Sequence, residues 1–237
     1  MSSVAARQIV QDNLSGLDVR EVSSNILCEF LEVAFHLILY IREIYPPVLF
    51  ERRRKYNVPV YMCVHPELCQ YLRDVLTGLL PLMKEGKMEE MWLSVQNKEH
   101  KVVEKFVFEL RGLDNEALSN DAHLLQLERD LRAILLKISV CDALLSPIPP
   151  GKSHPHPSHP HTHTHIHTDC TFSVQVQTTL RSAEAMEHQQ AVKEFPWVTA
   201  DPIDLTEATV VPLKTVSSSL LQMQLCVIES PLKSKEQ

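Results

Sequence analysis

The chain has 237 residues and a formal net charge of −7, which suits one large domain or two small ones and argues against broad electrostatic binding to DNA or RNA. Its six cysteines form no C-x-x-C pair, which excludes a zinc knuckle and a dithiol redox motif and fits a reduced compartment. Its five glycines build no phosphate-cradling loop, and the opening segment MSSVAARQIVQDNLSG has no apolar run typical of a secretory signal.

A long apolar segment, residues 25–48 (NILCEFLEVAFHLILYIREIYPPV), is the feature around which we expect the rest of the chain to fold. On a helix its polar residues fall on one narrow stripe, made of Asn25, Glu29, Glu32, His36 and Glu43. Charged residues interrupt the run too often for a membrane span, which needs about 20 apolar residues. We therefore predict a central core helix that ends at Pro46 and Pro47, preceded by a flexible N-terminal lead over residues 1–22.

Two short segments of different character follow this helix. Residues 51–55 (ERRRK) form a basic cluster, for which a solvated loop at the helix C-terminus and a nuclear-localisation signal are both open interpretations. Residues 58–62 (VPVYM) are predicted to be extended.

A second helix and a hairpin are predicted next. Residues 65–82 carry apolar side chains at helical spacing, and Pro66 suits a first-turn position. Residues 91–96 and 102–110 indicate a hairpin, because apolar and polar residues alternate in the second segment. One face of such a sheet must be covered, and the core helix is the obvious cover.

A third helix is predicted from about Ser119 to Leu145, where leucine and isoleucine recur at helical spacing. Polar residues at its start offer N-cap chemistry, and the prolines at 147, 149 and 150 end it.

The next segment, residues 152–169 (KSHPHPSHPHTHTHIHTD), holds seven of the chain's twelve histidines. It has almost no apolar surface to bury, so we predict a disordered His-rich insertion. Metal binding is the alternative, with weak candidate ligands at His161, His163, His165 and His167. A defined metal site needs ligands held in fixed geometry, which this tract does not indicate.

The C-terminal part contains short β-like pieces joined by long links. Residues 171–177 are predicted to form a strand with Phe172, Val174 and Val176 on one face. Residues 181–193 are ambiguous between helix and irregular structure, and extended pieces follow at 195–198, 210–213 and 220–228. Long links at the end of a domain are often functional.

No catalytic constellation stands out in the sequence. It has no G-x-S-x-G elbow, no H-E-x-x-H motif, and no cysteine with a nearby orienting histidine and aspartate. The pattern therefore predicts an α+β protein, with three helices packed on a mainly antiparallel sheet, that binds other molecules and is not an enzyme.

Several stretches also resemble one family, in order along the chain: NILCEFLEVAFHLILYIREIYP, KYNVPV, HPELCQY, NKEH followed by KVVEKFVFEL, LRAILLKISVCDALL, CTFSVQV, KEFPWV, and VPLKT followed by LQMQL. Together they are similar to the HORMA-domain accessory subunit of translesion DNA polymerase zeta, in the mitotic-arrest-deficient 2-like family. The resemblance covers residues 25–229, apart from the His-rich tract and weaker patches around 85–96, 111–123 and 199–209.

The resemblance implies a HORMA fold with a C-terminal safety belt, no cofactor and no catalysis. The HORMA domain would span residues 23–229, with a core over 23–180 interrupted by the His-rich insertion, a belt over about 181–229, and a tail over 230–237. In this family the belt wraps a short proline-containing peptide of a partner, which pairs as an added strand. Release of the trapped peptide then requires local unfolding.

The resemblance carries over to individual residues. Tyr71 and Trp197 match positions that contact the trapped peptide of the polymerase's catalytic subunit, although on spacing alone both also fit half-buried core aromatics. Val210, which is more often leucine in the family, and Gln224 match positions where the belt meets the C-terminal domain of a deoxycytidyl-transferase translesion polymerase. Cys226 stands where the family usually has a third contact residue, a tyrosine.

A third set of residues matches the family's HORMA–HORMA dimer. Arg132 matches its central arginine, for which a solvated helix charge is the plain alternative, and Glu43 and Ala143 lie on the matching surface. The resemblance further implies a homodimer or HORMA heterodimer, shieldin-type repair factors and a HORMA-remodelling AAA ATPase as partners, and no direct nucleic-acid or membrane binding.

The resemblance also implies cellular roles. These are DNA damage tolerance, double-strand-break repair choice and mitotic cell-cycle control, in the nucleus and also in the cytoplasm and at the spindle. A His-rich metal-binding protein is the alternative function.

Overall fold

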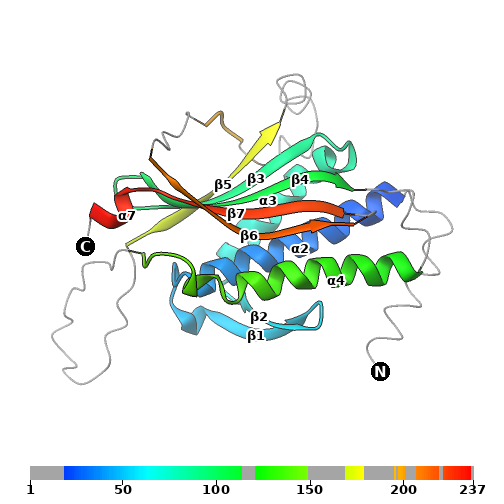
Figure 1. Ribbon diagram of the computed structural model, residues 1–237, viewed down its shortest axis with the longest axis horizontal. Coiled ribbons are helices and arrows are strands. Elements are labelled where there is room, and N and C mark those ends of the chain that lie inside the picture. Colours follow the sequence, from blue (N-terminus) through cyan, green and yellow to red (C-terminus); the bar gives the residue numbers. More distant parts are fainter. Residues whose placement is uncertain are drawn as a thin grey trace.

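A computed structural model describes residues 19–113, 121–148, 169–178, 195, 197–200, 207–218 and 221–235. In these residues, α2 and α4 run between a five-stranded sheet and a separate two-stranded hairpin (Figure 1). The predicted α+β class, with three long helices on an antiparallel sheet, is confirmed.

The central helix, α2 (Val19–Ile41), begins six residues before the predicted start and ends before the two prolines. Residues 19–22, predicted to belong to the flexible lead, are therefore helical, and Ser23 and Ser24 of the same helix are buried. The helix ends because Glu43 adopts a left-handed conformation (φ 51°), and the N–H groups of Glu43 and Ile44 donate back to Tyr40 and Leu39. A short 3-10 turn at Pro47–Leu49 follows.

Of the helices in the described residues, α2 is the one that is long and apolar enough to cross a membrane by length and composition. Its side chains are instead buried inside the protein, against α3, β2 and α4. Phe35, for example, is fully buried, with its ring centroid 5.8 Å from that of Phe108 on the sheet. The helix is therefore the core that the sequence predicts.

The second helix, α3 (Pro66–Lys84), matches the prediction closely. Its C-terminus is a Schellman motif, in which Gly86 has φ 65° and Gly86 and Lys87 donate to the carbonyls of Met83 and Leu82. This turn delivers the chain directly into the first strand of the sheet.

The third helix, α4 (Asp121–Ile138), is shorter than predicted. Its apolar stripe continues past the last helical turn, since Cys141 and Leu145 are buried. The backbone there forms a 3-10 turn at Cys141–Ala143 after Val140 leaves the helical region (φ −119°, ψ 7°). The spacing of apolar residues thus predicts which side chains are buried but not where the helix ends.

The five-stranded sheet is antiparallel and has the order β5-β3-β4-β7-β6. The predicted hairpin is β3 (Met88–Gln96) and β4 (Val102–Leu113), and β5 (Thr171–Thr178) pairs with β3. The C-terminal hairpin of β6 (Thr209–Ser217) and β7 (Leu221–Glu229) joins the sheet beside β4. Strands distant in sequence therefore form one continuous sheet.

The prediction of a solvated loop at residues 51–55 is wrong, because these residues belong to β1 (Phe50–Lys55). β1 pairs with β2 (Val58–Cys63) through a two-residue turn in which Tyr56 and Asn57 both have positive φ. Tyr56 packs its ring against Phe30, and this contact attaches the hairpin to α2. Five consecutive charged residues conceal the strand in the sequence because most of its side chains face solvent.

The segment after β7, predicted to be a C-terminal tail over residues 230–237, packs against the domain over its described residues. A short helix, α7 (Leu232–Lys235), follows β7, and both Ser230 and Lys233 are buried. Residues 152–168 of the His-rich tract, residues 181–193 and Ser119 lie outside the described residues.

Candidate functional site

One edge of the five-stranded sheet is open. β5 pairs with β3 on one side, and no described strand pairs with its other side. Its sequence, TFSVQVQT, contains no charged residue and no proline. An edge of this kind presents a row of backbone N–H and C=O groups to which another chain can add as a strand.

A row of aromatic rings follows this edge. Tyr71 of α3 is 37% exposed, and its ring centroid lies 5.7 Å from that of Phe172 on β5 and 5.9 Å from that of Phe195. The ring of Phe195 lies 4.9 Å from Trp197, and Tyr45 lies 6.1 Å from Phe172. We call these five residues the aromatic row. The structure thus brings the two predicted peptide contacts, Tyr71 and Trp197, into one cluster.

Two polar groups of the aromatic row, the Tyr71 hydroxyl and the Trp197 indole N–H, are relevant to binding at the open edge. Burial raises the pKa of Tyr71, and a hydrogen bond from the Val174 backbone N–H offsets part of that rise. This N–H is therefore on the open side of β5. The buried Nε1–H of Trp197 finds no acceptor among the described residues. A buried donor without an acceptor is uncommon, and an added backbone supplies acceptors.

The sequence analysis found Tyr71 and Trp197 as contacts but missed Tyr45, Phe172 and Phe195. A usable signal was present for Phe195, which stands two residues before Trp197 in an extended piece, so that the two side chains share a side. No such signal was present for Tyr45, because its contact with Phe172 joins two residues that are far apart in the chain.

The predicted contacts to a second polymerase lie on the outer face of the C-terminal hairpin. Their neighbours Met223, Leu225 and Val227 face the helices and are buried. Gln224 and Cys226 therefore face outward, and Val210, which pairs with Ile228, lies on the same face and is 59% exposed.

Two details describe the chemistry of this outer face. The guanidinium of Arg111 donates to Gln224 Oε1 at 3.5 Å. Burial, with Glu90 and Glu109 nearby, raises the pKa of the Cys226 thiol, so this cysteine stays protonated and acts as a small apolar contact. The structure thus places the three predicted residues on one surface.

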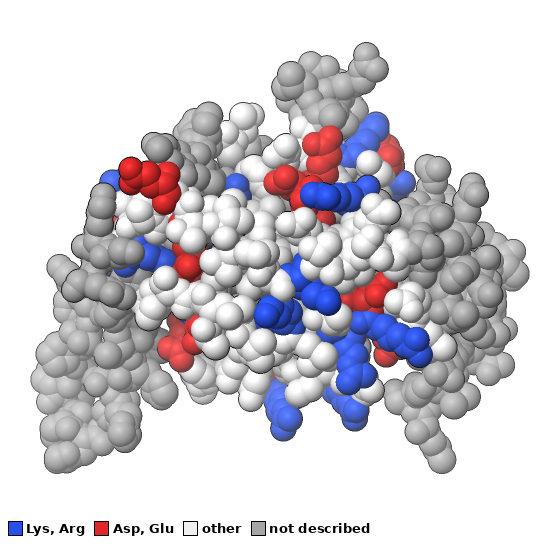
Figure 2. Space-filling view, in the orientation of Figure 1, with Lys and Arg blue, Asp and Glu red and all other residues white. Residues whose placement is uncertain are grey.

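The predicted dimer residues are all exposed, but they fall in two places. Glu43 and Ala143 lie at one end of the helices, because their neighbours Arg42 and Asp142 form an ion pair. Arg132 lies further back along α4. Figure 2 shows Lys and Arg side chains gathered over α4, the helix that carries Arg132, and over the β1–β2 hairpin. The surface is basic although the whole chain is acidic.

No metal site is found in the described part of the chain. No group of three His, Cys, Asp or Glu side chains there is arranged to hold a metal ion. The four weak histidine candidates lie outside the described residues.

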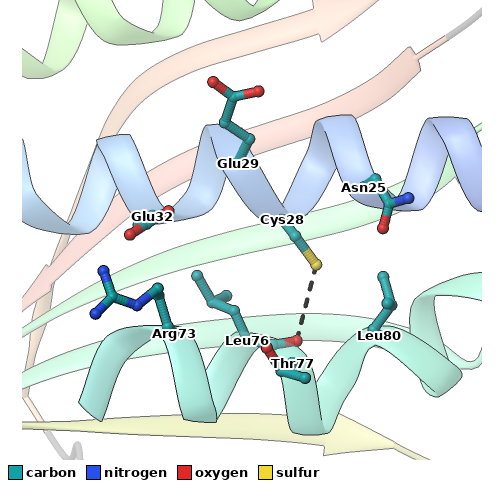
Figure 3. Close-up of a pocket in the computed structure, with 8 residues that line it drawn as sticks. All are labelled: Asn25, Cys28, Glu29, Glu32, Arg73, Leu76, Thr77 and Leu80. Atoms are coloured by element: carbon teal, nitrogen blue, oxygen red, sulfur yellow. Dashed lines mark hydrogen bonds between the residues drawn. The ribbon is translucent and has the colours of Figure 1, made fainter. Parts of the chain in front are cut away.

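A hollow of about 210 Å³ lies between α2 and α3, lined by Cys28, Glu29, Glu32 and Arg73 among others (Figure 3). Burial raises the pKa of Cys28 to about 12, and its thiol lies 3.8 Å from the Leu76 carbonyl oxygen. A thiol with this pKa is not a nucleophile at neutral pH.

Comparison with known proteins gives a consistent result. A HORMA-domain family model matches residues 23–138. The chain is 44% identical over 220 residues to the mitotic spindle assembly checkpoint protein MAD2B of Danio rerio, a match that covers 92% of this chain and 96% of that protein. It is 44% identical to MAD2B of Homo sapiens, covering 90% and 93%. DNA polymerase zeta subunit 2 of Drosophila melanogaster is 27% identical, covering 88% and 98%.

Solved structures show the same fold. A chain of the mitotic checkpoint complex superposes with a TM-score of 0.67 at 23% identity, covering 87% of this chain and 98% of that chain. C. elegans HTP-2 bound to a HIM-3 closure motif superposes with a TM-score of 0.59 at 13% identity, covering 89% and 91%. The HORMA fold that the sequence resemblance implies is therefore confirmed.

Proposed function

The chain belongs to the HORMA-domain family, with MAD2B proteins among its relatives, and from this premise we propose that it is a non-catalytic adaptor that traps a partner peptide along β5. The peptide adds as a strand to the open edge, and the C-terminal segment closes over it as a safety belt. The single observation that carries this proposal is the uncharged, unpaired edge of β5 lined by the aromatic row.

The path of the chain supports the belt. Trp197 lies at the β5 end of the sheet through its contact with Phe195, whereas β6 begins at Thr209 on the opposite edge. Between these two residues the chain passes from one edge of the sheet to the other. A peptide seated on β5 would therefore lie beside Trp197, at the start of the segment that leads to β6. Solved relatives of this fold include HTP-2 bound to a closure motif.

The names of the relatives suggest the partners. We assign the trapped peptide to the catalytic subunit of DNA polymerase zeta, in keeping with the polymerase zeta subunit of Drosophila melanogaster. The outer face of Val210, Gln224 and Cys226 would then bind the deoxycytidyl-transferase translesion polymerase. The adaptor would bridge two polymerases during DNA damage tolerance, with the edge and the outer face as separate surfaces.

The wider proposal follows from the same family membership. The exposed residues Arg132, Glu43 and Ala143 would form a homodimer or HORMA heterodimer. Shieldin-type repair factors and a HORMA-remodelling AAA ATPase are further proposed partners. A role in double-strand-break repair choice, and one in mitosis as the MAD2B name indicates for the relatives, would place the protein in the nucleus, the cytoplasm and the spindle.

The test is the affinity of a proline-containing peptide from the catalytic subunit for wild type and for Trp197→Ala. Loss of a large aromatic anchor is expected to weaken binding by about 2 kcal/mol or more, roughly thirtyfold in Kd. The matched control is Trp92→Ala. Trp92 lies on β3, away from the aromatic row, and its ring is covered by the Lys105 ammonium. Equal affinity of wild type and Trp197→Ala would remove Trp197 from the site.

A further inference from the structure

A cluster of four charged side chains is buried where the C-terminal hairpin ends. Arg42 follows α2, Glu104 lies on β4, Glu229 ends β7, and Lys233 lies on α7. Their side chains are 2%, 0%, 10% and 2% exposed. We call these residues the ionic cluster. Two positive and two negative charges balance inside it.

Glu104 is the centre of the ionic cluster. Its carboxylate accepts from Arg42 Nε at 3.0 Å and from Arg42 Nη2 at 2.9 Å, which is the two-pronged geometry of a strong charge-assisted pair. The same carboxylate also binds the ammonium of Lys233, which in turn lies 2.5 Å from Glu229 Oε1. The Glu104 carboxylate thus joins Arg42 at the end of α2 to Lys233 on α7.

The backbone of Ser146, beyond α4, completes the cluster. Its carbonyl accepts from Arg42 Nη2 at 2.7 Å and from Lys233 Nζ at 3.0 Å. Its N–H donates to Glu229 Oε1 at 2.9 Å. Glu229 and Lys233 are therefore bound to two separate parts of the domain, Glu104 on β4 and Ser146 beyond α4.

The cluster is favourable only when complete. Burying a charge is costly, and a pair whose partner is removed leaves an uncompensated charge inside the protein. Glu229 and Lys233 come from the C-terminal hairpin and its short helix, whereas Arg42 and Glu104 belong to the core. Detachment of the hairpin would separate the two halves at once, so its attachment is cooperative.

We propose that Glu229 and Lys233 form a latch that holds the β6–β7 hairpin on the sheet and couples its release to the surface at Glu43 and Ala143. The coupling runs through Arg42, whose guanidinium binds Asp142 as well as Glu104. Asp142 precedes Ala143 and Arg42 precedes Glu43 in the chain. The latch rests on the proposed trapping function and adds a control point to it.

The test is amide hydrogen exchange of the whole protein without peptide, for wild type and for Lys233→Met. The variant leaves Glu229 buried beside no cation, so exchange in β6, β7 and residues 141–146 is expected to be on the order of a hundredfold faster. Exchange in α3 and β3 should stay as in wild type. Lys214→Met is the matched control, because it removes one charge from the same hairpin outside the ionic cluster.

A double variant keeps the test valid if Lys233→Met folds poorly. In Glu229→Gln/Lys233→Met the charges of both latch residues are absent, and Arg42 and Glu104 still balance each other. Exchange in β7 should return to within about tenfold of wild type, since replacing both partners is far milder than removing one. The latch is disproved by unchanged exchange in Lys233→Met, by equal acceleration in α3 and β3, or by a double variant no better than the single. Hydrogen exchange without peptide does not depend on peptide affinity. A failure of the trapping proposal would therefore appear in the affinity measurement and not in this one.

Discussion

The two edges of the five-stranded sheet are built differently. At one edge, β6 contains Pro212 and Lys214, and its register with β7 shifts between them. Proline, lysine and a local irregularity are the devices by which proteins stop an edge strand from pairing with another chain. At the other edge, β5 has neither proline nor lysine, and its register with β3 shifts only at its last residues, where Thr178 pairs with Met88 and Gln177 with Glu90. Phe172 of the aromatic row lies on this strand.

The difference indicates which edge is meant to be paired. An exposed uncharged edge is an aggregation hazard unless something covers it. This protein protects β6, and α4 packs against the same strand through the buried Leu213 and Val216. The unprotected state of β5 is therefore best explained by a guest strand, which is the proposed peptide.

The largest expected effect comes from giving β5 the protection that β6 already has. The Val174 N–H lies on the open side, and Val176, two residues on, points its N–H the same way. Val176→Pro removes that donor, so we expect peptide binding to weaken by about 2–3 kcal/mol, near a hundredfold in Kd, with Tm changed by only a few degrees. Calorimetric titration and thermal unfolding measure the two quantities.

The neighbouring position supplies the control. Successive N–H groups point to opposite sides of a strand, so the N–H of Gln175, next to Val174, faces β3 and belongs to the internal ladder. Gln175→Pro should lower the free energy of unfolding by about 1–3 kcal/mol. If Val176→Pro binds peptide as wild type does, the guest does not add to this edge.

A smaller effect is expected at the outer face beside the protected edge. Cys226 replaces the tyrosine that is usual in the family, and Pro212 lies opposite it on β6. Cys226→Tyr adds an aromatic ring to this face and should strengthen binding to the C-terminal domain of the deoxycytidyl-transferase polymerase by about 1 kcal/mol, roughly fivefold. Cys226→Ser should give no gain. Weaker binding by the tyrosine variant would place the interface elsewhere.

The smallest effect is expected from deleting residues 152–169, which precede β5. A loop twice as long costs only about 0.6 kcal/mol more to close, so Tm and peptide affinity should barely change. The deletion also removes the exposed Lys98–Asp169 ion pair, and such pairs contribute little. A loss above about 2 kcal/mol in either quantity would show that the tract has a structural role. Zinc titration of both chains tests the metal-binding alternative.

Much of the fold follows from local patterns in the chain. The apolar surface of α2, the spacing in α3 and the alternation in β4 each predict an element and its buried face, because periodicity directly reflects which side is covered. The positions where α2 and α4 end cannot be predicted from this periodicity. The helix α2 ends at Glu43, which is left-handed, and α4 ends before the 3-10 turn at Cys141. β1 was missed because an exposed hairpin strand needs no apolar alternation.

By itself, the sequence determined the core helix, the strands, the family resemblance, and Tyr71 and Trp197 as candidate contacts. Only the tertiary structure decided that these two residues meet through Phe172 and Phe195 beside an open strand, and that Lys233 reaches Glu104. The physical reason is distance along the chain. Periodicity reports on neighbours within a few residues, whereas strand order and buried ion pairs depend on how segments a hundred residues apart pack together.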